Sequence, residues 1–284
     1  MTASRRPLLV VDGDSFAHRA FHAVPRSAFR RLDGGPGNAL NGFLSMLLRL
    51  WQAERPRAVV VGWDTVGAPT YRNELLPGYQ SGREFDPELV EQLDLLPGLV
   101  ASSGIVCAKQ AGYEADDFLA AAVTQEEGRG GATLVATSDR DAFQLASDST
   151  TILQPARGVR ELVRLGPAEV RERYGVEPEQ VPDFIALRGD PSDRIPGARG
   201  VGEKTAASLL AEHGSLEALL ESGRFTAEAG ALRSYLAIAR LDHTAPLPEI
   251  GDVRPDWSTV AGSARELGLD GLAARLEEAG GAGR

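Results

Sequence analysis

The chain has 284 residues, enough for one large domain or two small ones, and 43% of them are hydrophobic. It contains no membrane-length apolar run, no signal peptide and one cysteine, which together predict a soluble cytoplasmic protein without a disulfide or a thiolate zinc cluster. The net charge of −10 does not exclude nucleic acid as a partner, because much of the acidity is gathered in one group of candidate site residues.

Short apolar runs alternate with helical patterns, such as that of residues 38–54, along the first 165 residues. Three of the runs end in an aspartate, namely 8–11 before Asp12, 58–63 before Asp64 and 133–138 before Asp139. Further strands are predicted at 105–108 and 151–153, with a hairpin at 158–165. This alternation is typical of a parallel sheet flanked by helices, which binds ligands at the carboxyl ends of its strands. We therefore expect an α/β fold in which these acids converge.

Three further acids, Glu114, Asp116 and Asp117, lie within four residues just before an apolar helical run. An ordinary solvated helix start remains an alternative, because the helix dipole favours acids there. However, the aspartates that end the strands would approach the same place. A divalent metal is the usual way to make so many carboxylates tolerable together.

The segment 67–99, called the arch segment below, differs in character from its neighbours. Aromatic and basic side chains are interleaved there among prolines and glycines, namely Tyr71, Arg72, Tyr79, Arg83 and Phe85, before the pattern becomes helical. Such residues suit stacking on bases and contact with phosphates. A surface insertion with ordinary packing remains the alternative.

From Gly166 onward helical patterns take over. Glycines at 197, 200 and 202, followed by Lys204, allow a tight turn between two helices whose free backbone N–H groups suit a phosphate. A nucleotide-binding P-loop and a dinucleotide fingerprint are excluded, because no strand precedes the glycines and the order Gly-Glu-Lys-Thr is wrong for the former. A helix connection without a ligand remains open.

These motifs occur together in the order found in the 5′-nuclease family of flap endonucleases and 5′→3′ exonucleases. Because of these motifs the chain resembles that family. The residues that produce the resemblance are 11–13, Asp64, 71–74, 114–117, 138–141, 189–193 and 195–205. The resemblance implies a PIN-like α/β core with a mainly parallel sheet in 1–165, including a helical arch at about 67–99. It also implies a helix-three-turn-helix region in 166–260. A C-terminal helix at about 264–278 and a disordered tail complete 261–284. No polymerase segment follows, so a freestanding, monomeric member is expected.

The resemblance also implies two Mg²⁺ sites, for which Mn²⁺ can substitute. Their ligands would be Asp12, Asp64, Glu114, Asp116, Asp117, Asp139, Asp141, Asp190 and Asp193. The first four would serve the catalytic ion, and Asp139 and Asp141 would lie between the ions. Asp117, Asp190 and Asp193 would act on the second ion or through water. Paired ions of this kind activate water and stabilise the leaving oxygen of a phosphodiester.

For the substrate, the resemblance implies DNA with 5′ ends, flaps or RNA primers. Arg72 and Arg83 would contact phosphates at the cleavage site. DNA contacts are expected from Arg19, Tyr79, Gly197, Gly200, Gly202, Lys204 and Thr205, with a K⁺ ion at the helix-three-turn-helix. A DNA polymerase or ligase would be a working partner, in the nucleoid.

Three residues depart from the family pattern. Gln80 replaces the usual lysine at the base of the arch, so that a positive charge is missing there. Arg194 stands where asparagine is usual, and Asp14 adds a tenth carboxylate near the site. No predicted ligand is lost, so an active enzyme is expected.

The sequence therefore predicts a metal-dependent 5′→3′ exonuclease and flap endonuclease for replication and repair. Two alternatives remain. A non-catalytic protein that binds DNA junctions would keep the fold, and a PIN-type ribonuclease would share the acidic sheet but lack the helix-three-turn-helix.

Overall fold

In the computed structural model, described for residues 6–65, 67–82, 84–156 and 161–281, a six-stranded sheet forms the centre of the molecule. The strand order is β3-β2-β1-β4-β5-β6. The strands are β1 (Leu8–Asp12), β2 (Ala58–Gly62), β3 (Val106–Ala108), β4 (Thr133–Ala136), β5 (Thr150–Pro155) and β6 (Leu162–Leu165). The first five are parallel, and β6 pairs antiparallel with β5. The mainly parallel sheet predicted from the sequence is thus confirmed.

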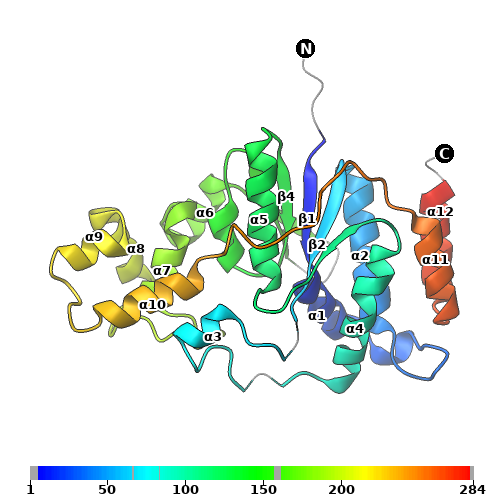
Figure 1. Cartoon of the computed structure of the whole chain (residues 1–284), viewed down its shortest axis with the longest axis horizontal. Coiled ribbons are helices and arrows are strands. Elements are labelled where there is room, and N and C mark those ends of the chain that lie inside the picture. The colour runs from blue at the N-terminus through cyan, green and yellow to red at the C-terminus, as the bar shows by residue number, and fades with distance from the viewer. Residues whose placement is uncertain (1–5, 66, 83, 157–160, 282–284) are drawn as a thin grey trace, which may run out of the picture.

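Helices cover both faces of this sheet (Figure 1). Alternate strand residues point to opposite faces, so β1 contributes Leu8 and Val10 to one hydrophobic cluster and Leu9 and Val11 to the other. The helices on the second face are α1 (Gly13–Ala23), α2 (Asn38–Glu54), α4 (Pro87–Ala101), α11 (Trp257–Glu266) and α12 (Asp270–Gly281). The first face is covered by α5 (Ala115–Gly128) and, beyond it, by the helical region.

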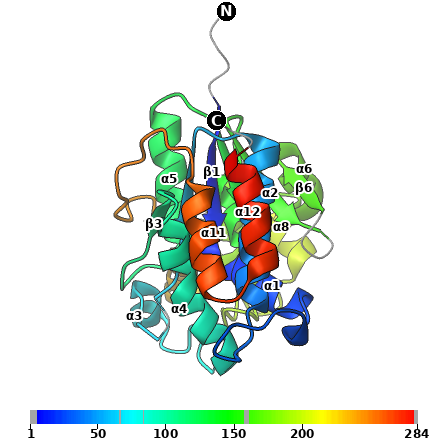
Figure 2. The ribbon, with the colours of Figure 1, turned by 90° about the vertical axis from the view of Figure 1, so that its right-hand side faces the viewer.

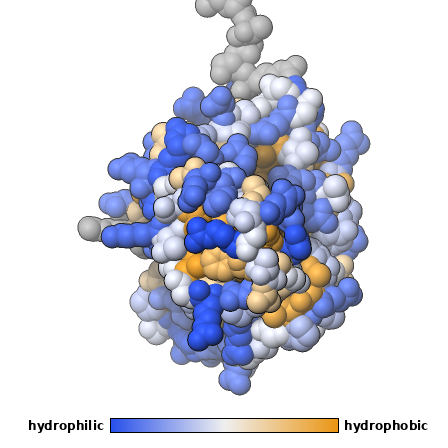
Figure 3. Space-filling model, turned by 90° about the vertical axis from the view of Figure 1, so that its left-hand side faces the viewer, coloured by the Kyte–Doolittle hydropathy of each residue, from blue (hydrophilic) through white to orange (hydrophobic). Residues whose placement is uncertain are grey.

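The helical region extends the molecule to one side of the sheet (Figure 1). It contains α6 (Pro167–Tyr174), α7 (Val181–Arg188), α8 (Glu203–His213), α9 (Leu216–Glu221) and α10 (Ala229–Ala239). Figure 3 looks onto this end, where hydrophilic side chains surround a smaller hydrophobic area. No helix in the described ranges is both long and apolar enough to cross a bilayer.

Two parts of the chain differ from the predicted elements. The single helix expected near the C-terminus is wrong, because the structure has two, α11 and α12, separated at Gly268 in a left-handed conformation (φ 81°). Figure 2 shows the pair side by side, with α12 in front of α2. In the arch segment, α3 (Tyr71–Leu75) and α4 are separate helices, and the described residues between them, 76–82 and 84–86, form no helix or strand. The predicted disordered end falls partly on residues 282–284, outside the described residues.

The last residue of β2, Gly62, lies directly under the first turn of α5. A Cβ at this position would be 2.6 Å from the carbonyl oxygen of Ala115 and 2.9 Å from a methyl carbon of Leu119. The first contact is to backbone, so the helix and the strand would have to move apart. Gly62 therefore sets how closely the acids at the start of α5 approach those at the ends of the strands.

Gly62→Ala is accordingly expected to lower the free energy of unfolding by about 1 to 3 kcal/mol through overpacking. Gly98→Ala on α4 is the matched control, because nothing lies within 4 Å of its added Cβ, and a gain of about 0.4 to 1 kcal/mol is expected. Urea unfolding of both variants measures this difference. Equal stabilities would show that α5 adjusts freely over β2.

Candidate metal-binding active site

The carboxyl ends of three neighbouring strands place three aspartates at one edge of the sheet. Asp12 ends β1, Asp64 follows β2 and Asp139 follows β4. The Asp12 carboxylate is held on both sides, because Oδ1 accepts a hydrogen bond from the Ser15 N–H (2.9 Å) and Oδ2 accepts one from the Thr137 hydroxyl (2.8 Å). Contacts from α1 and from the residue after β4 thus fix this acid in place.

Two more acids come from the start of α5, which points at the same edge. Glu114 is the N-cap residue of this helix, and Asp116 is in its first turn. Asp64 Oδ1 accepts a hydrogen bond from the Ala115 N–H (2.7 Å), which ties the end of β2 to this helix. A cavity of about 690 Å³ opens there, and its acidic lining residues are Asp12, Asp14, Asp64, Glu114, Asp116 and Asp139. The structure therefore brings together the five central acids predicted from the sequence, with Asp14 as a sixth.

Burial is the main cause of raised pKa values for Asp12, Glu114 and Asp116, and neighbouring carboxylates add to it. Burial raises the pKa of Asp12 to about 7, and the charges of Asp64 and Asp139 add to the effect. Burial likewise raises the pKa of Glu114 to about 7, although Arg72 opposes the rise. The pKa of Asp116 is raised well above its usual range, first by burial and then by neighbouring carboxylates, again against Arg72. So many ionised groups are stable together only with cations beside them.

The donor set of the cavity suits a hard divalent cation. It consists of carboxylate oxygens, which Mg²⁺ and Mn²⁺ prefer. One buried oxygen, Asp116 Oδ1, has no hydrogen-bond partner in the protein. Among the described residues, no group of three or more histidine, cysteine, aspartate or glutamate side chains is arranged so that it could hold a metal ion. The fit of a divalent cation to this cavity therefore rests on the chemistry of its oxygen donors.

Three other predicted ligands form a second acidic group beside the first. Asp141 belongs to the 3₁₀ helix Asp141–Leu145, and its N–H donates to Asp139 Oδ1 (3.0 Å). Asp190 and Asp193 lie in the loop between α7 and α8. The pKa of Asp141 is raised well above its usual range, first by burial and then by the charges of Asp139, Asp193 and Asp190. The structure thus places these acids near one another, outside the cavity lining.

Arg72 and Asp117 form a buried ion pair. Arg72 is 1% exposed and Asp117 is fully buried, and the two Arg72 terminal nitrogens donate to Asp117 at 2.7 and 2.8 Å. Arg72 Nε also donates to the Ile238 carbonyl (3.0 Å), while Asp117 accepts from the N–H groups of Glu114 and Asp242. Neither side chain lines the cavity.

The structure shows protein contacts for two residues that were predicted as a metal ligand and a phosphate contact. Asp117 accepts hydrogen bonds from Arg72 and from two backbone N–H groups, and Arg72 is buried. The Arg72 guanidinium also lies 3.7 Å from Glu114 Oε2 and 3.7 Å from Asp116 Oδ1. Asp117 thus holds the Arg72 guanidinium beside the two acids of α5 that line the cavity.

Tyr79, predicted as a DNA-binding residue, is also buried, at 4% exposure. Its hydroxyl donates to Glu114 Oε2 (3.0 Å), and burial and the charge of Glu114 raise its pKa far above the usual range. Tyr79 therefore orients a cavity acid. In the same way Asp14 Oδ2 accepts from the Asp64 N–H (2.7 Å), a supporting contact that sequence reasoning did not identify.

Other predicted DNA contacts lie on the surface of the helical region. Gly200, Gly202, Lys204 and Thr205 are exposed around the start of α8. Gly197 has φ 74°, and a Cβ there would be 2.5 Å from the Gly189 nitrogen, so only glycine fits this turn. Arg19 is partly buried on α1, and Arg83 lies outside the described residues.

Sequence comparison finds relatives across most of the chain. The family model described as 5'-3' exonuclease, N-terminal resolvase-like domain, matches residues 7–175, and the model described as 5'-3' exonuclease, C-terminal SAM fold, matches residues 176–246. A 5'-3' exonuclease of Mycobacterium tuberculosis is 37% identical over 257 residues, which are 83% of this chain and 80% of that protein. DNA polymerase I of Mycobacterium bovis is 45% identical over 216 residues, 76% of this chain. The match spans 24% of that polymerase's length.

Solved structures with the same fold include two of the bacteriophage T5 D15 protein. One was co-crystallised with metal ions and matches with a TM-score of 0.68 at 19% identity, over 97% of this chain and 100% of that one. The other is a flap endonuclease complex with DNA and metal ions, with a TM-score of 0.70 at 19% identity, over 97% of this chain and 99% of that one. At this identity the likeness shows the fold, which is that of PIN-like 5′ nucleases with a helical SAM-like region.

Proposed function

This chain belongs to the 5′-3′ exonuclease family of nuclease hydrolases, and we propose that it cleaves DNA at 5′ ends and 5′ flaps with two divalent metal ions. The observation that supports this most is the convergence of six carboxylates on one cavity. The likeness to T5 structures that contain metal ions, or DNA and metal ions, supports this proposal. Mg²⁺ is the proposed ion, and Mn²⁺ is expected to substitute.

The acids of the cavity and those of the α7–α8 side have separate tasks in this proposal. Asp12, Asp64, Glu114 and Asp116 would hold one ion, Asp190 and Asp193 would serve the other, and Asp139 and Asp141 would lie between them. When bound, such ions lower the pKa of water to yield a nucleophile and offset the charge on the phosphodiester and its leaving oxygen. Removal of RNA primers and flaps during replication and repair, alongside a DNA polymerase or ligase, is the proposed setting.

The protein's own groups keep these acids in position. The Thr137 hydroxyl and the Ser15 N–H hold Asp12, and the Tyr79 hydroxyl holds Glu114. Asp14 accepts from the N–H of Asp64 and so fixes the chain at the end of β2. These contacts arrange the carboxylates before substrate arrives, which reduces the reorganisation needed for reaction.

The binding of DNA is proposed to follow its shape. The exposed turn before α8 presents backbone N–H groups and Lys204, which suit phosphates; a K⁺ ion is also proposed there. Phosphate contacts set the position of DNA and read no sequence. A free 5′ strand beside a duplex is therefore the expected recognition feature.

A labelled 5′-flap assay tests the function. Cleavage near the flap junction is expected with Mg²⁺ or Mn²⁺, and none with EDTA, because the carboxylates cannot activate water without a cation. Blunt duplex and an RNA flap of the same sequence serve as controls. DNA binding without cleavage under all metal conditions would favour the non-catalytic alternative, and preference for the RNA flap would favour a ribonuclease.

A further inference from the structure

Two segments far apart in the chain meet where Gln80 and Ser81 line the carboxylate cavity, a place called the cavity mouth below. Gln80 Nε2 donates to Asp193 Oδ1 (3.2 Å), and the Gln80 N–H donates to the Asp193 carbonyl (3.3 Å). Beside them, Arg194 Nη1 donates to the Ser81 hydroxyl (2.8 Å). The arch segment and the α7–α8 loop are therefore joined by side chains on both sides.

The backbone at this junction is held in an unfavourable conformation. Gln80 (φ 47°) and Arg194 (φ 60°) are two of the four non-glycine residues with positive φ in the described ranges. The Arg194 turn is closed by paired backbone hydrogen bonds between Asp190 and Ile195, both 2.8 Å. Strain of this kind persists where the surrounding structure requires it, often at ligand sites. The Arg194 side chain is thus placed by its turn.

The charge of Arg194 is located where the cavity lacks one. Gln80 and Ser81 line the cavity, and among the described lining residues there are six carboxylates and no lysine or arginine. Arg72 forms ion pairs with the cavity acids Glu114 and Asp116, but its side chain is buried, at 1% exposure. Arg194 is exposed and contacts the lining residue Ser81. A DNA strand entering the cavity would meet carboxylates first unless a cation stood at the mouth.

We propose that Arg194 is a phosphate-binding residue, supplied by the helical region, that positions the single 5′ strand as it passes the cavity mouth. The arch segment holds the guanidinium at the mouth through Ser81, and Gln80 fixes the arch to the same loop through Asp193. The inference rests on the proposed function for its substrate. It assigns to Arg194 a positive charge beside a cavity whose described lining has no lysine or arginine.

The test measures flap binding in EDTA, so that it does not depend on cleavage. Arg194→Ala is expected to weaken the binding of a fluorescent 5′-flap DNA about tenfold at moderate salt, the effect of losing one charged phosphate contact. The slope of log affinity against log salt should fall by about 0.7 to 1. Arg194→Lys should retain most of the slope, because it retains the charge. Arg265→Ala, in an exposed pair on α11, is the matched control and should change neither quantity.

Two further variations distinguish phosphate binding from a merely structural tie. Ser81→Ala removes the hydrogen bond to Arg194 and leaves the charge of Arg194 in place. It should therefore weaken the binding of flap DNA less than about threefold and leave the salt slope unchanged. A methylphosphonate linkage removes the charge of one phosphate. When it is moved one position at a time along the flap, wild type and Arg194→Ala should bind with equal affinity at one position, where Arg194 has lost its charged partner. An unchanged salt slope in Arg194→Ala, a Ser81→Ala variant as weak as Arg194→Ala, or no such linkage would overturn the proposal. Failure of flap cleavage with intact binding would instead refute the proposed catalytic function.

Discussion

Replacement of Asp116 by asparagine is expected to reduce flap cleavage about a thousandfold, a loss of about 4 kcal/mol of transition-state stabilisation. Asp116 lines the cavity, its Oδ1 has no hydrogen-bond partner in the protein, and asparagine keeps its shape while removing its charge. The affinity for flap DNA should change little, because the proposed contacts to the duplex lie on the helical region. Single-turnover cleavage and anisotropy titration with the same labelled flap measure the two quantities.

The thermal stability of Asp116→Asn is a second quantity that tests the role of this acid. Burial raises the pKa of Asp116 well above its usual range, so the ionised carboxylate opposes folding at neutral pH when no cation is present. In EDTA, Asp116→Asn should therefore unfold at a temperature no lower than wild type. Asp94→Asn, an exposed acid on α4, is the matched control and should retain full cleavage. Near-native turnover by Asp116→Asn would show that this acid does not hold a catalytic ion.

Replacement of Arg72 by methionine is expected to lower the free energy of unfolding by about 3 to 5 kcal/mol, because it leaves the buried Asp117 charge without its partner. Burial lowers the pKa of Arg72, but its carboxylate neighbours outweigh that effect and raise the pKa well above normal, so the side chain remains charged. Urea unfolding at pH 7 measures the change. The double variant with Asp117→Asn should recover part of the loss, since both charges are then removed.

The exposed pair of Arg171 and Glu177 provides the control for Arg72. Both side chains are about half exposed, and Arg171→Ala should cost less than about 1 kcal/mol. If Arg72→Met unfolds like wild type and yet loses cleavage, Arg72 acts on the substrate, as the family resemblance implied. If stability falls as expected, the ion pair with Asp117 is its main task.

Much of the cavity was determined by local sequence. A β-branched apolar run followed by an acid specifies a buried strand and the position of its last residue. Parallel pairing then brings Asp12, Asp64 and Asp139 to one edge regardless of the chain between them. The helix pattern of residues 38–54 was equally local, and α2 has the same bounds. The single strands and α2 depend on neighbours within one element, so periodicity suffices to predict them, and the shared edge follows from the rule that parallel strands end together.

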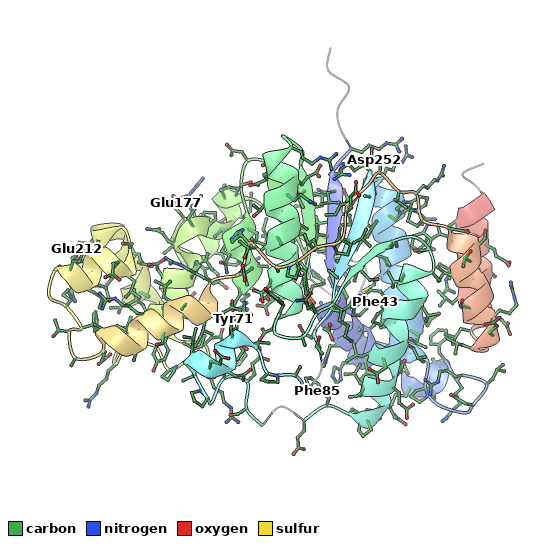
Figure 4. The ribbon with its side chains drawn as sticks, in the orientation of Figure 1. Phe43, Tyr71, Phe85, Glu177, Glu212 and Asp252 are labelled. Atoms are coloured by element: carbon green, nitrogen blue, oxygen red, sulfur yellow. The ribbon has the colours of Figure 1, made fainter. Side chains whose placement is uncertain are left out.

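The tertiary structure alone decided which polar groups face the cavity. Asp116 and Asp117 are adjacent, but successive residues of a helix point about 100° apart, so one reaches the cavity and the other meets Arg72. Arg72 is buried because α3 packs against α10; Figure 4 shows Tyr71 beside that helix, where its hydroxyl donates to the Arg240 carbonyl. The contact of Ser81 with Arg194 spans 113 positions. Such pairings follow from how whole elements pack together, and no spacing within either segment encodes them.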